Sequence, residues 1–155
     1  MKIDIYTDGA CRVHTSKTGG WAYSASIDVG KDVPIEIWDL GAEKNSTSNR
    51  MELTAIMEAM KFLWHSNLLG HNITIFSDSQ YSVKGCNLWL KGWIKRGFIS
   101  SQDKEIKNRD LWVKVNSLIK CTHPKIEWIR GHDGCPGNER VDKLAVIAAE
   151  QYDEV

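Results

Sequence analysis

The chain has 155 residues, 42% of them hydrophobic, and a formal net charge of zero at pH 7. These values are ordinary for one soluble globular domain, and overall charge gives no reason to expect nucleic-acid binding. No apolar run approaches the roughly 20 residues that cross a membrane, and Asp4 and Asp8 interrupt the apolar core that a secretory signal needs. The four cysteines are scattered and contain no Cys-x-x-Cys pair, so no disulfide framework is expected. We therefore expect a cytoplasmic protein with reduced thiols, formed as a single domain over residues 1–155.

The first part of the chain predicts three strands and one helix. Residues 2–8 are rich in β-branched and aromatic residues and predict a strand that stops at an aspartate. Apolar and polar residues alternate over 21–29 and again over 35–38, which predicts a hairpin. The polar run 43–48 predicts a loop, and the apolar residues of 53–64 recur at helical spacing and form one face.

The second part predicts alternating strands and helices. Residues 72–78 form a strand pattern that again ends at an aspartate, and residues 79–120 predict helical pieces broken at glycines. A strand over 125–130 and a loop over 131–137 lead to a final helix over 138–151. Three strands followed by alternating helix and strand predict an α/β sandwich with a mixed sheet.

Four acidic residues stand where a carboxylate can face a metal ion. Asp8 and Asp78 each end a predicted strand, Glu52 lies in the first turn of a predicted helix, and Asp142 lies early in another. Ligands of open α/β sheets bind beyond the carboxyl ends of the strands. Clusters of carboxylate oxygens prefer hard cations such as Mg²⁺ or Mn²⁺. The pattern predicts a divalent metal site if folding brings the four acids together.

Each acid also has a purely structural interpretation. Glu52 stands three residues after Asn49 and could complete a capping box at the start of its helix. The acid of the last helix could complement the helix dipole, and the two aspartates at strand ends could form turns. For any single acid the structural interpretation is favoured, whereas for the four taken together the metal-site interpretation is favoured.

A local excess of positive charge lies in residues 84–110, which carry seven Lys and Arg against three Asp and Glu. The same stretch contains Trp89, Trp93 and Phe98. Basic residues interleaved with aromatic ones suit a surface that follows a nucleic-acid backbone. Because the two tryptophans are four residues apart, at least one of them is expected to pack into the core instead.

The acidic motifs resemble those of type 1 ribonucleases H, the bacterial-like enzymes that cut RNA paired with DNA. The resemblance covers nearly the whole chain and keeps the order of the family's motifs. It is carried by the acidic segments 6–11, 47–53, 77–81 and 128–142, and the basic segment 89–97 is similar to the family's protrusion. One such motif would be weak evidence, but four at the family's spacing are a specific signal.

The resemblance implies a five-stranded mixed sheet, with three antiparallel strands followed by two parallel ones, flanked by helices. It also implies an endonuclease that hydrolyses the RNA strand of RNA–DNA hybrids and leaves 5′-phosphate and 3′-hydroxyl ends. Asp8, Glu52, Asp78 and Asp142 would bind two Mg²⁺ ions, with Mn²⁺ as the alternative cation. Paired cations of this kind can activate a water and stabilise the leaving oxygen. His132 would assist proton transfer or product release, in a secondary role.

The same resemblance implies side chains that hold the hybrid. The RNA strand would be read at its 2′-hydroxyls and the DNA strand held by its phosphates. The expected substrate contacts are Cys11, Thr47, Asn49, Gln80, Trp89, Trp93, Lys95, Arg96, Lys107 and Asn108. The chain departs from the family in the loop 12–18, which replaces a Gly- and Pro-rich turn, and at Ser48, which replaces an asparagine. Arg12, His14 and Lys17 could supply phosphate contacts in that loop.

Three other functions are weighed against this one. A nuclease of the same superfamily that acts on DNA is disfavoured by the basic segment and by the second acidic motif. A non-catalytic module that binds hybrids is disfavoured because all four acids are present. A nucleotide-binding ATPase is disfavoured because no Gly-rich phosphate-binding motif occurs. We expect a monomer without an obligate protein partner and without membrane attachment.

Overall fold

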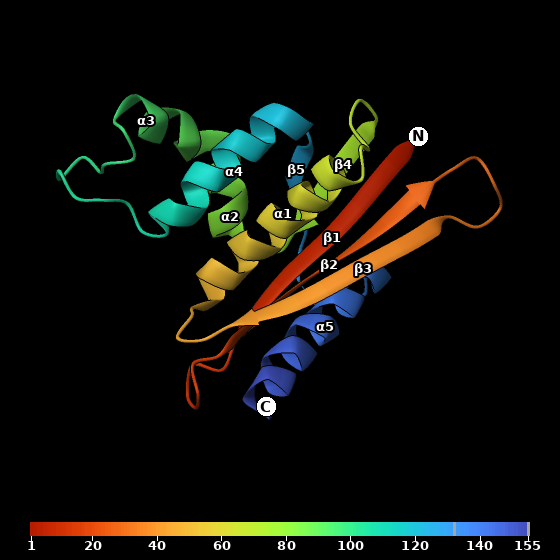
Figure 1. Cartoon of the computed structure of the whole chain (residues 1–155), viewed down its shortest axis with the longest axis horizontal. Helices are drawn as coiled ribbons and strands as arrows, with labels where there is room; N and C mark the ends of the chain where they lie inside the picture. Colours follow the sequence, from red (N-terminus) through yellow and green to blue (C-terminus); the bar gives the residue numbers. More distant parts are fainter. Residues whose placement is uncertain (132, 155) are drawn as a thin grey trace.

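Five strands form a single mixed sheet. They are β1 (Lys2–Cys11), β2 (Gly19–Asp28), β3 (Ile35–Glu43), β4 (Asn72–Ser77) and β5 (Lys125–Trp128). In this computed structural model, which describes residues 1–131 and 133–154, they lie in the order β3-β2-β1-β4-β5 (Figure 1). The β1–β2 and β2–β3 pairs are antiparallel, and the β1–β4 and β4–β5 pairs are parallel. The expected fold class is confirmed.

Two strands are longer than the sequence pattern predicts. The first strand was expected to stop at Asp8 but continues to Cys11, because β2 pairs with it up to the Cys11–Gly19 register. Its parallel partner β4 pairs only as far as Tyr6 opposite Phe76. β3 likewise runs to Glu43, where a loop was expected. The hairpin partner therefore extends both strands past the point where alternation in their own sequence ends.

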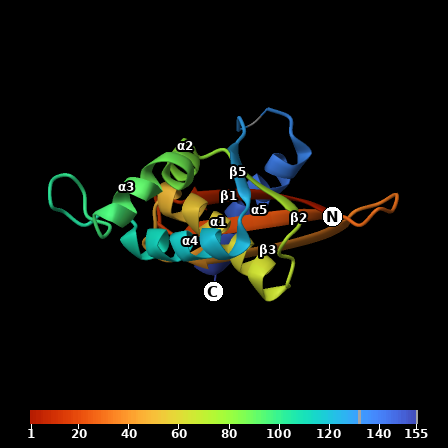
Figure 2. The ribbon, with the colours of Figure 1, turned by 90° about the horizontal axis from the view of Figure 1, so that it is seen from above.

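Helices cover both faces of the sheet. They are α1 (Ser48–His65), α2 (Gln80–Lys84), the π-helix η1 (Gly85–Trp89), α3 (Leu90–Lys95), α4 (Arg109–Thr122) and α5 (Pro136–Asp153). Figures 1 and 2 show α1 and α4 on one face and α5 on the other. The predicted protrusion, 84–110, contains η1, α3 and the loop that leads to α4, and it reaches the edge of the molecule (Figure 1). Among the described residues, no helix combines the length and the apolar character of a membrane span.

The main core lies between α1 and the sheet. Ile3, Ile5 and Ile75 of the central strands are fully buried against Leu53 and Ile56 of α1. A smaller cluster under α5 is formed by Ala22, Val141 and Ala145. A Cβ atom on Gly20 would lie 2.0 Å from the Ala145 carbonyl oxygen, so only glycine lets α5 approach β2 this closely. This approach brings Asp142, the predicted site residue of α5, toward Asp8 near the end of the central strand β1.

Candidate metal and nucleic-acid site

Three of the four predicted acids meet at one edge of the sheet. Carboxylate oxygens of Asp8, Glu52 and Asp78 all lie within 4.8 Å of one another. Asp8 stands on β1 just beyond its pairing with β4, and Asp78 directly follows β4. Thr7 Oγ1 donates a hydrogen bond of 2.8 Å to the Phe76 carbonyl oxygen and joins the two strands at this point. The parallel pairing of β1 and β4 therefore places the two aspartates side by side.

The position of Glu52 depends on a close approach between α1 and β1. A Cβ atom on Gly9 would lie 2.3 Å from the Glu52 nitrogen and 2.4 Å from the Met51 carbonyl carbon. No larger residue fits unless the helix moves away from the strand. Gly9 N–H also donates a hydrogen bond of 2.9 Å to Asp8 Oδ1. Gly9 therefore has two effects: its N–H orients the Asp8 carboxylate, and its lack of a side chain lets α1, which carries Glu52, pack closely on β1.

The capping-box interpretation of Glu52 is wrong. Thr47 is the N-cap of α1, and its side chain accepts a hydrogen bond from the Arg50 N–H at 3.1 Å. Glu52 therefore lies in the second turn, not the first as the sequence suggested, and is too far along to close a box. Its Oε2 atom is buried without a hydrogen-bond partner in the described part of the chain. A carboxylate oxygen in this situation is available for a cation.

Burial and mutual repulsion disfavour negative charge in this cluster. Burial raises the pKa of Asp8 from its ordinary 3.8 to about 7, and the charge of Asp78 adds to the rise. Hydrogen bonds from the Glu52 side chain and the Gly9 N–H act in the opposite direction. The pKa of Glu52 is raised well above its usual range by burial first and then by the charge of Asp8. Positive charge placed nearby would therefore favour the ionised form of both carboxylates.

The donor set fits a hard divalent cation. All three groups offer carboxylate oxygens, which Mg²⁺ and Mn²⁺ prefer over nitrogen or sulfur ligands. The unpartnered Oε2 of Glu52 and the unfavourable like charges would both be satisfied by such an ion. The cluster therefore has the chemistry of a metal site.

The remaining predicted acid and the predicted histidine are placed differently. Asp142 is not one of the three mutually close acids, but its side chain reaches Asp8, in an interaction that raises the pKa of Asp8. It lies beside the cluster on α5. An acid complements the helix dipole best in the first turn, and Asp142 lies beyond that turn. His132 lies outside the described residues, between Gly131 and Asp133.

Four of the predicted substrate contacts line one pocket at the start of α1, about one helical turn before Glu52. The pocket has a volume of about 370 Å³ and is lined by Thr47, Asn49, Tyr81, Lys107 and Asn108. Tyr81 belongs to the third acidic motif, but nothing in the motif indicated this position. Its hydroxyl accepts hydrogen bonds from Asn108 Nδ2 at 3.2 Å and from Trp112 Nε1 at 3.0 Å. The pocket wall is therefore anchored to the core through a fully buried tryptophan.

The two tryptophans of the basic segment divide between surface and core, as the spacing allowed. Trp89 is 39% exposed, whereas Trp93 packs against the main core, with its ring centroid 5.0 Å from that of Trp112. The Trp89 and Trp93 centroids are 5.8 Å apart. Trp89 thus presents one face to solvent and rests on a partner that the core holds in place.

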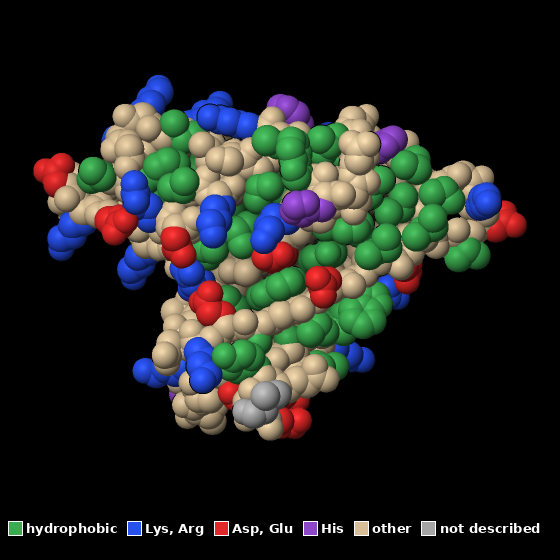
Figure 3. Space-filling view, viewed as in Figure 1, with side chains coloured by type: hydrophobic (Ala, Val, Ile, Leu, Met, Phe, Trp, Pro, Cys, Tyr) green, Lys and Arg blue, Asp and Glu red, His purple; other side chains and the backbone are tan. Residues whose placement is uncertain are grey.

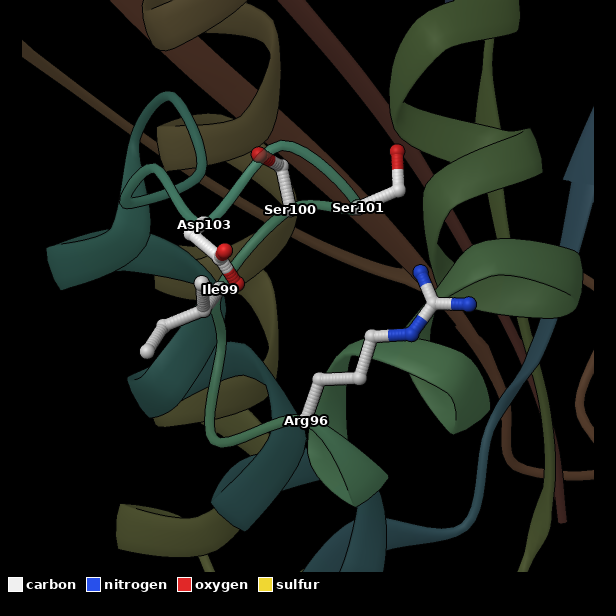
Figure 4. A pocket seen from close by; sticks show the side chains of 5 residues that line it. All are labelled: Arg96, Ile99, Ser100, Ser101 and Asp103. Atoms are coloured by element: carbon white, nitrogen blue, oxygen red, sulfur yellow. The ribbon is translucent and has the colours of Figure 1, made fainter.

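Two exposed basic side chains end the helix that follows Trp89. Lys95 and Arg96 are exposed at the end of α3, and Figure 3 shows Lys and Arg side chains over this side of the molecule. A second pocket, of about 360 Å³, is lined by Arg96, Ile99, Ser100, Ser101 and Asp103, and the Arg96 side chain points away from that of Asp103 (Figure 4). This pocket belongs to the protrusion and includes none of the clustered acids.

The residues of the first loop and its surroundings are only partly free. Cys11 is half-buried, and its Sγ donates to the Ser46 carbonyl oxygen at 3.3 Å. Gln80 is exposed at the first position of α2. Arg12, which could supply a phosphate contact, forms an ion pair with Asp153 at 3.2 Å.

Comparison with known proteins agrees with this geometry. The family model described as RNase H matches residues 1–150. A ribonuclease H of Cupriavidus necator is 40% identical over 145 residues, which cover 94% of this chain and 93% of the relative. A ribonuclease H of Dechloromonas aromatica is 42% identical over 149 residues, covering 96% and 94%.

A solved structure supports the same conclusion. The crystal structure of LC9-RNase H1, a type 1 RNase H with the type 2 active-site motif, has a TM-score of 0.86 to this chain at 26% identity. The match covers 96% of this chain and 72% of that one. The resemblance read from the acidic motifs is thereby confirmed, and the chain belongs to the ribonuclease H family.

Proposed function

We propose that Asp8, Glu52 and Asp78, with Asp142 beside them, hold two Mg²⁺ ions with which this ribonuclease H hydrolyses the RNA strand of RNA–DNA hybrids. Mn²⁺ is the alternative cation. The observation that carries the proposal is the meeting of three carboxylates within 4.8 Å, one of them with a buried, unpartnered oxygen. As a member of its family the chain is a metal-dependent endoribonuclease.

The division of work among the residues follows from their positions. When bound, two divalent cations supply activation of the attacking water and neutralisation of charge on the leaving 3′ oxygen. Asp8 is held in orientation by the Gly9 N–H, and Glu52 by the packing of α1 on β1. Both carboxylates are largely withdrawn from water, and electrostatic interactions are stronger in such surroundings than in water. His132, one residue after Gly131, is suited to carry a proton to or from the reacting groups near neutral pH.

The hybrid is proposed to lie across the edge where the acids and the 370 Å³ pocket meet. Cys11, Asn49 and Gln80 face the RNA strand, whose 2′-hydroxyls distinguish it from DNA. The DNA strand is held by its phosphates in the pocket that Thr47, Lys107 and Asn108 line. The protrusion continues this contact, with Trp89 against a sugar, Trp93 supporting it, and Lys95 and Arg96 near phosphates.

One assay tests the reaction. End-labelled RNA–DNA hybrid, double-stranded RNA and double-stranded DNA are incubated with Mg²⁺ and, in parallel, with a chelator. We expect cutting of the RNA strand of the hybrid alone, only with Mg²⁺, and products with 5′-phosphate ends. Intact hybrid in the Mg²⁺ reaction would contradict the proposal, and cleavage of double-stranded DNA would favour a DNA-directed nuclease.

The metal role of Asp8 is tested by Asp8→Asn. We expect the rate of hybrid cleavage to fall by about 10³-fold or more, because one charged ligand of the cations is lost. Hybrid affinity, measured by filter binding, should stay within about threefold, since phosphate and sugar contacts supply most of it. Asp32→Asn is the matched control, because Asp32 is an exposed acid in the turn between β2 and β3. Full activity of the Asp8 variant would remove Asp8 from the site.

The assembly proposed is a monomer. The acidic cluster and the adjacent pocket are both completed by residues of one chain, so no second copy is required to form them. Sedimentation at micromolar concentration tests this, and an obligate dimer would contradict it. A cytoplasmic location stays a prediction from the sequence.

A further inference from the structure

The last turn of α5 is tied to the loop between β1 and β2. Asp153 accepts hydrogen bonds from Ser16 Oγ at 2.6 Å and from Thr18 Oγ1 at 2.5 Å. Its Oδ2 atom also lies 3.2 Å from Arg12 Nε. One carboxylate near the end of the chain therefore contacts the beginning, the middle and the end of the loop 12–18.

The opposite side of this loop contacts the start of α1. The Lys17 carbonyl oxygen accepts the Ser46 N–H at 2.9 Å, and the Cys11 thiol lies against the Ser46 carbonyl oxygen at 3.3 Å. Ser46 directly precedes Thr47, the N-cap of the helix that carries Glu52. A continuous set of contacts thus connects Asp153, through the loop, to the helix that forms part of the active site.

Polar contacts, not burial, attach the loop to the rest of the protein. Residues 12–17 are all exposed, and only Thr18 is buried. Backbone hydrogen bonds from Arg12 N to the Thr18 oxygen and from Lys17 N to the Arg12 oxygen, both 2.9 Å, close the turn internally. They do not fix its direction relative to the sheet, whereas the contacts with Asp153 and Ser46 do.

A pocket of about 410 Å³ lies where the loop meets α1, lined by Val13, Lys17, Asn45, Ser46 and Thr47. It shares Thr47 with the pocket assigned to a DNA phosphate, so the two hollows adjoin at that residue. Ser46 Oγ is buried there without a hydrogen-bond partner in the described part of the chain. The position of the loop therefore determines the shape of the surface next to the proposed hybrid contacts.

We propose that Asp153 is a positioning residue for hybrid binding. It holds the loop 12–18 against the start of α1, so that Lys17, Cys11 and Thr47 present a preformed surface to the sugar–phosphate backbone. Its pairing with Arg12 also compensates that charge, which leaves Lys17 as the loop's unpaired cation among these residues. The inference rests on the proposed function of the same site. Because preorganisation reduces the ordering required on binding, its loss should weaken binding and leave the chemical step unchanged.

Two substitutions separate the parts of this contact. Asp153→Ala removes all three interactions, whereas Asp153→Asn keeps one acceptor oxygen, for either the Ser16 or the Thr18 hydroxyl, and removes the charge opposite Arg12. Glu150→Gln is the matched control, because Glu150 is an exposed acid on the same helix. Steady-state cleavage of a defined hybrid with Mg²⁺ gives KM and kcat for each variant, and thermal unfolding shows whether each is folded.

We expect Asp153→Ala to raise KM by about tenfold with kcat within about twofold, a change of the size that one lost charged hydrogen bond produces. Asp153→Asn should lie between this variant and the wild type, and Glu150→Gln should match the wild type. Trypsin should cut after Arg12 or Lys17 faster in the alanine variant, since the loop is then released. An unchanged KM, or an equal fall in kcat, would overturn the proposal.

A combined variant checks that the loop transmits the effect. Ser16→Ala with Thr18→Val should raise KM in the wild type but add little in the Asp153→Ala background, because the same contacts are already lost. Fully additive effects would contradict the proposed connection. Absence of hybrid cleavage by the wild-type protein would instead refute the proposed function, so the two failures are distinguishable.

Discussion

At Gly9, the missing side chain sets the distance between a strand and a helix, and with it the distance between two carboxylates. Asp8 and Glu52 come from parts of the chain more than forty residues apart and meet because the backbone of α1 lies directly on Gly9. Both carboxylates are thereby held where burial and repulsion raise their pKa values. Backbone packing, not a polar contact, holds the two carboxylates close together, which is unfavourable when both are charged. A bound cation would stabilise the charged pair.

Gly9→Ala tests this dependence. The added Cβ would lie 2.3 Å from the Glu52 nitrogen, so α1 must shift away from β1. We expect a loss of roughly 2–4 kcal/mol in the free energy of unfolding, because overpacking against backbone cannot be relieved by a side-chain rotation. We also expect at least about a 10²-fold fall in cleavage rate, the scale that misplacement of a catalytic group by 1 Å produces. Urea unfolding and the hybrid assay measure the two effects.

Gly92→Ala is the matched control for this substitution. Nothing lies within 4 Å of a Cβ atom on Gly92, which is inside α3 and has no positive φ. We expect an increase in stability of about 0.5–1 kcal/mol, since alanine favours the helix over glycine. A Gly9 variant as stable and active as the Gly92 variant would show that close packing of α1 on β1 is not required.

At the scale of elements, η1, α3 and α4 contribute a row of contacting aromatic rings that are tilted or edge-on to one another. Trp112 of α4 is fully buried and contacts both Tyr81 and Trp93, whose ring centroids lie 5.8 Å and 5.0 Å away. Trp93 in turn contacts Trp89, the only one of these three tryptophans that is clearly exposed. The exposed ring of Trp89 is therefore supported by Trp93, which is supported in turn by the buried Trp112.

The two substitutions Trp89→Ala and Trp93→Ala should separate binding from stability. Trp89→Ala should weaken hybrid affinity by about 1–3 kcal/mol, the range of aromatic contacts with nucleic acid, with little change in unfolding. Trp93→Ala should lower the free energy of unfolding by roughly 3 kcal/mol or more, because it removes an aromatic ring from the core. Filter binding and urea unfolding give the comparison. Equal effects of both substitutions on stability would contradict the assigned division.

The sequence predicted the elements better than their ends. Alternation identified all five strands, but it could not show that β1 continues past Asp8, since that extension depends on the partner strand β2. The helix start was misjudged because Asn49 and Thr47 are both good caps, and only the fold selects Thr47. The end of β1 is therefore set by a partner strand, and the start of α1 by which of two possible caps the fold uses.

For the site, residue types were predictable and contacts were not. The acids could be found because a metal site requires carboxylates, and motif spacing supplied their order. The role of Tyr81 in the pocket wall and the bond from Asp153 to the first loop depend on tertiary neighbours. A hydroxyl or carboxylate of this kind has no local signal, because its partners lie 27 and 137 residues away.

For the molecule as a whole, zero net charge conceals a separation of charges. Lys and Arg outnumber Asp and Glu in the protrusion, where Figure 3 shows both kinds of side chain at the surface, whereas the acidic cluster is withdrawn at the sheet edge. Exposed cations can attract a polyanion while the buried acids retain their own requirement for a divalent ion. The buried acids therefore make the stability of the folded protein depend on pH and on metal ions.

The direction of this dependence follows from Asp8 and Glu52. The pKa of Asp8 in the folded protein is about 7, above its ordinary 3.8, and that of Glu52 is also raised. The folded state therefore binds protons more tightly than the unfolded state. Stability from this source is full below about pH 4 and is lost as the pH rises through about 7. A cation that binds the ionised carboxylates should restore it at higher pH.

We therefore expect Mg²⁺ to raise the Tm clearly at pH 8 and only slightly at pH 5, relative to the protein in chelator. Asp8→Asn removes one ionisable group from the cluster. It should stabilise the metal-free protein at pH 8 by on the order of 2 kcal/mol, since one pKa unit corresponds to about 1.4 kcal/mol. The same variant should lose most of its response to Mg²⁺. Asp32→Asn, at an exposed turn, should retain the wild-type response at both pH values. Equal Mg²⁺ effects on the wild type and on Asp8→Asn would place the stabilising ion elsewhere, because a cation held by this cluster cannot be indifferent to the loss of its most buried carboxylate.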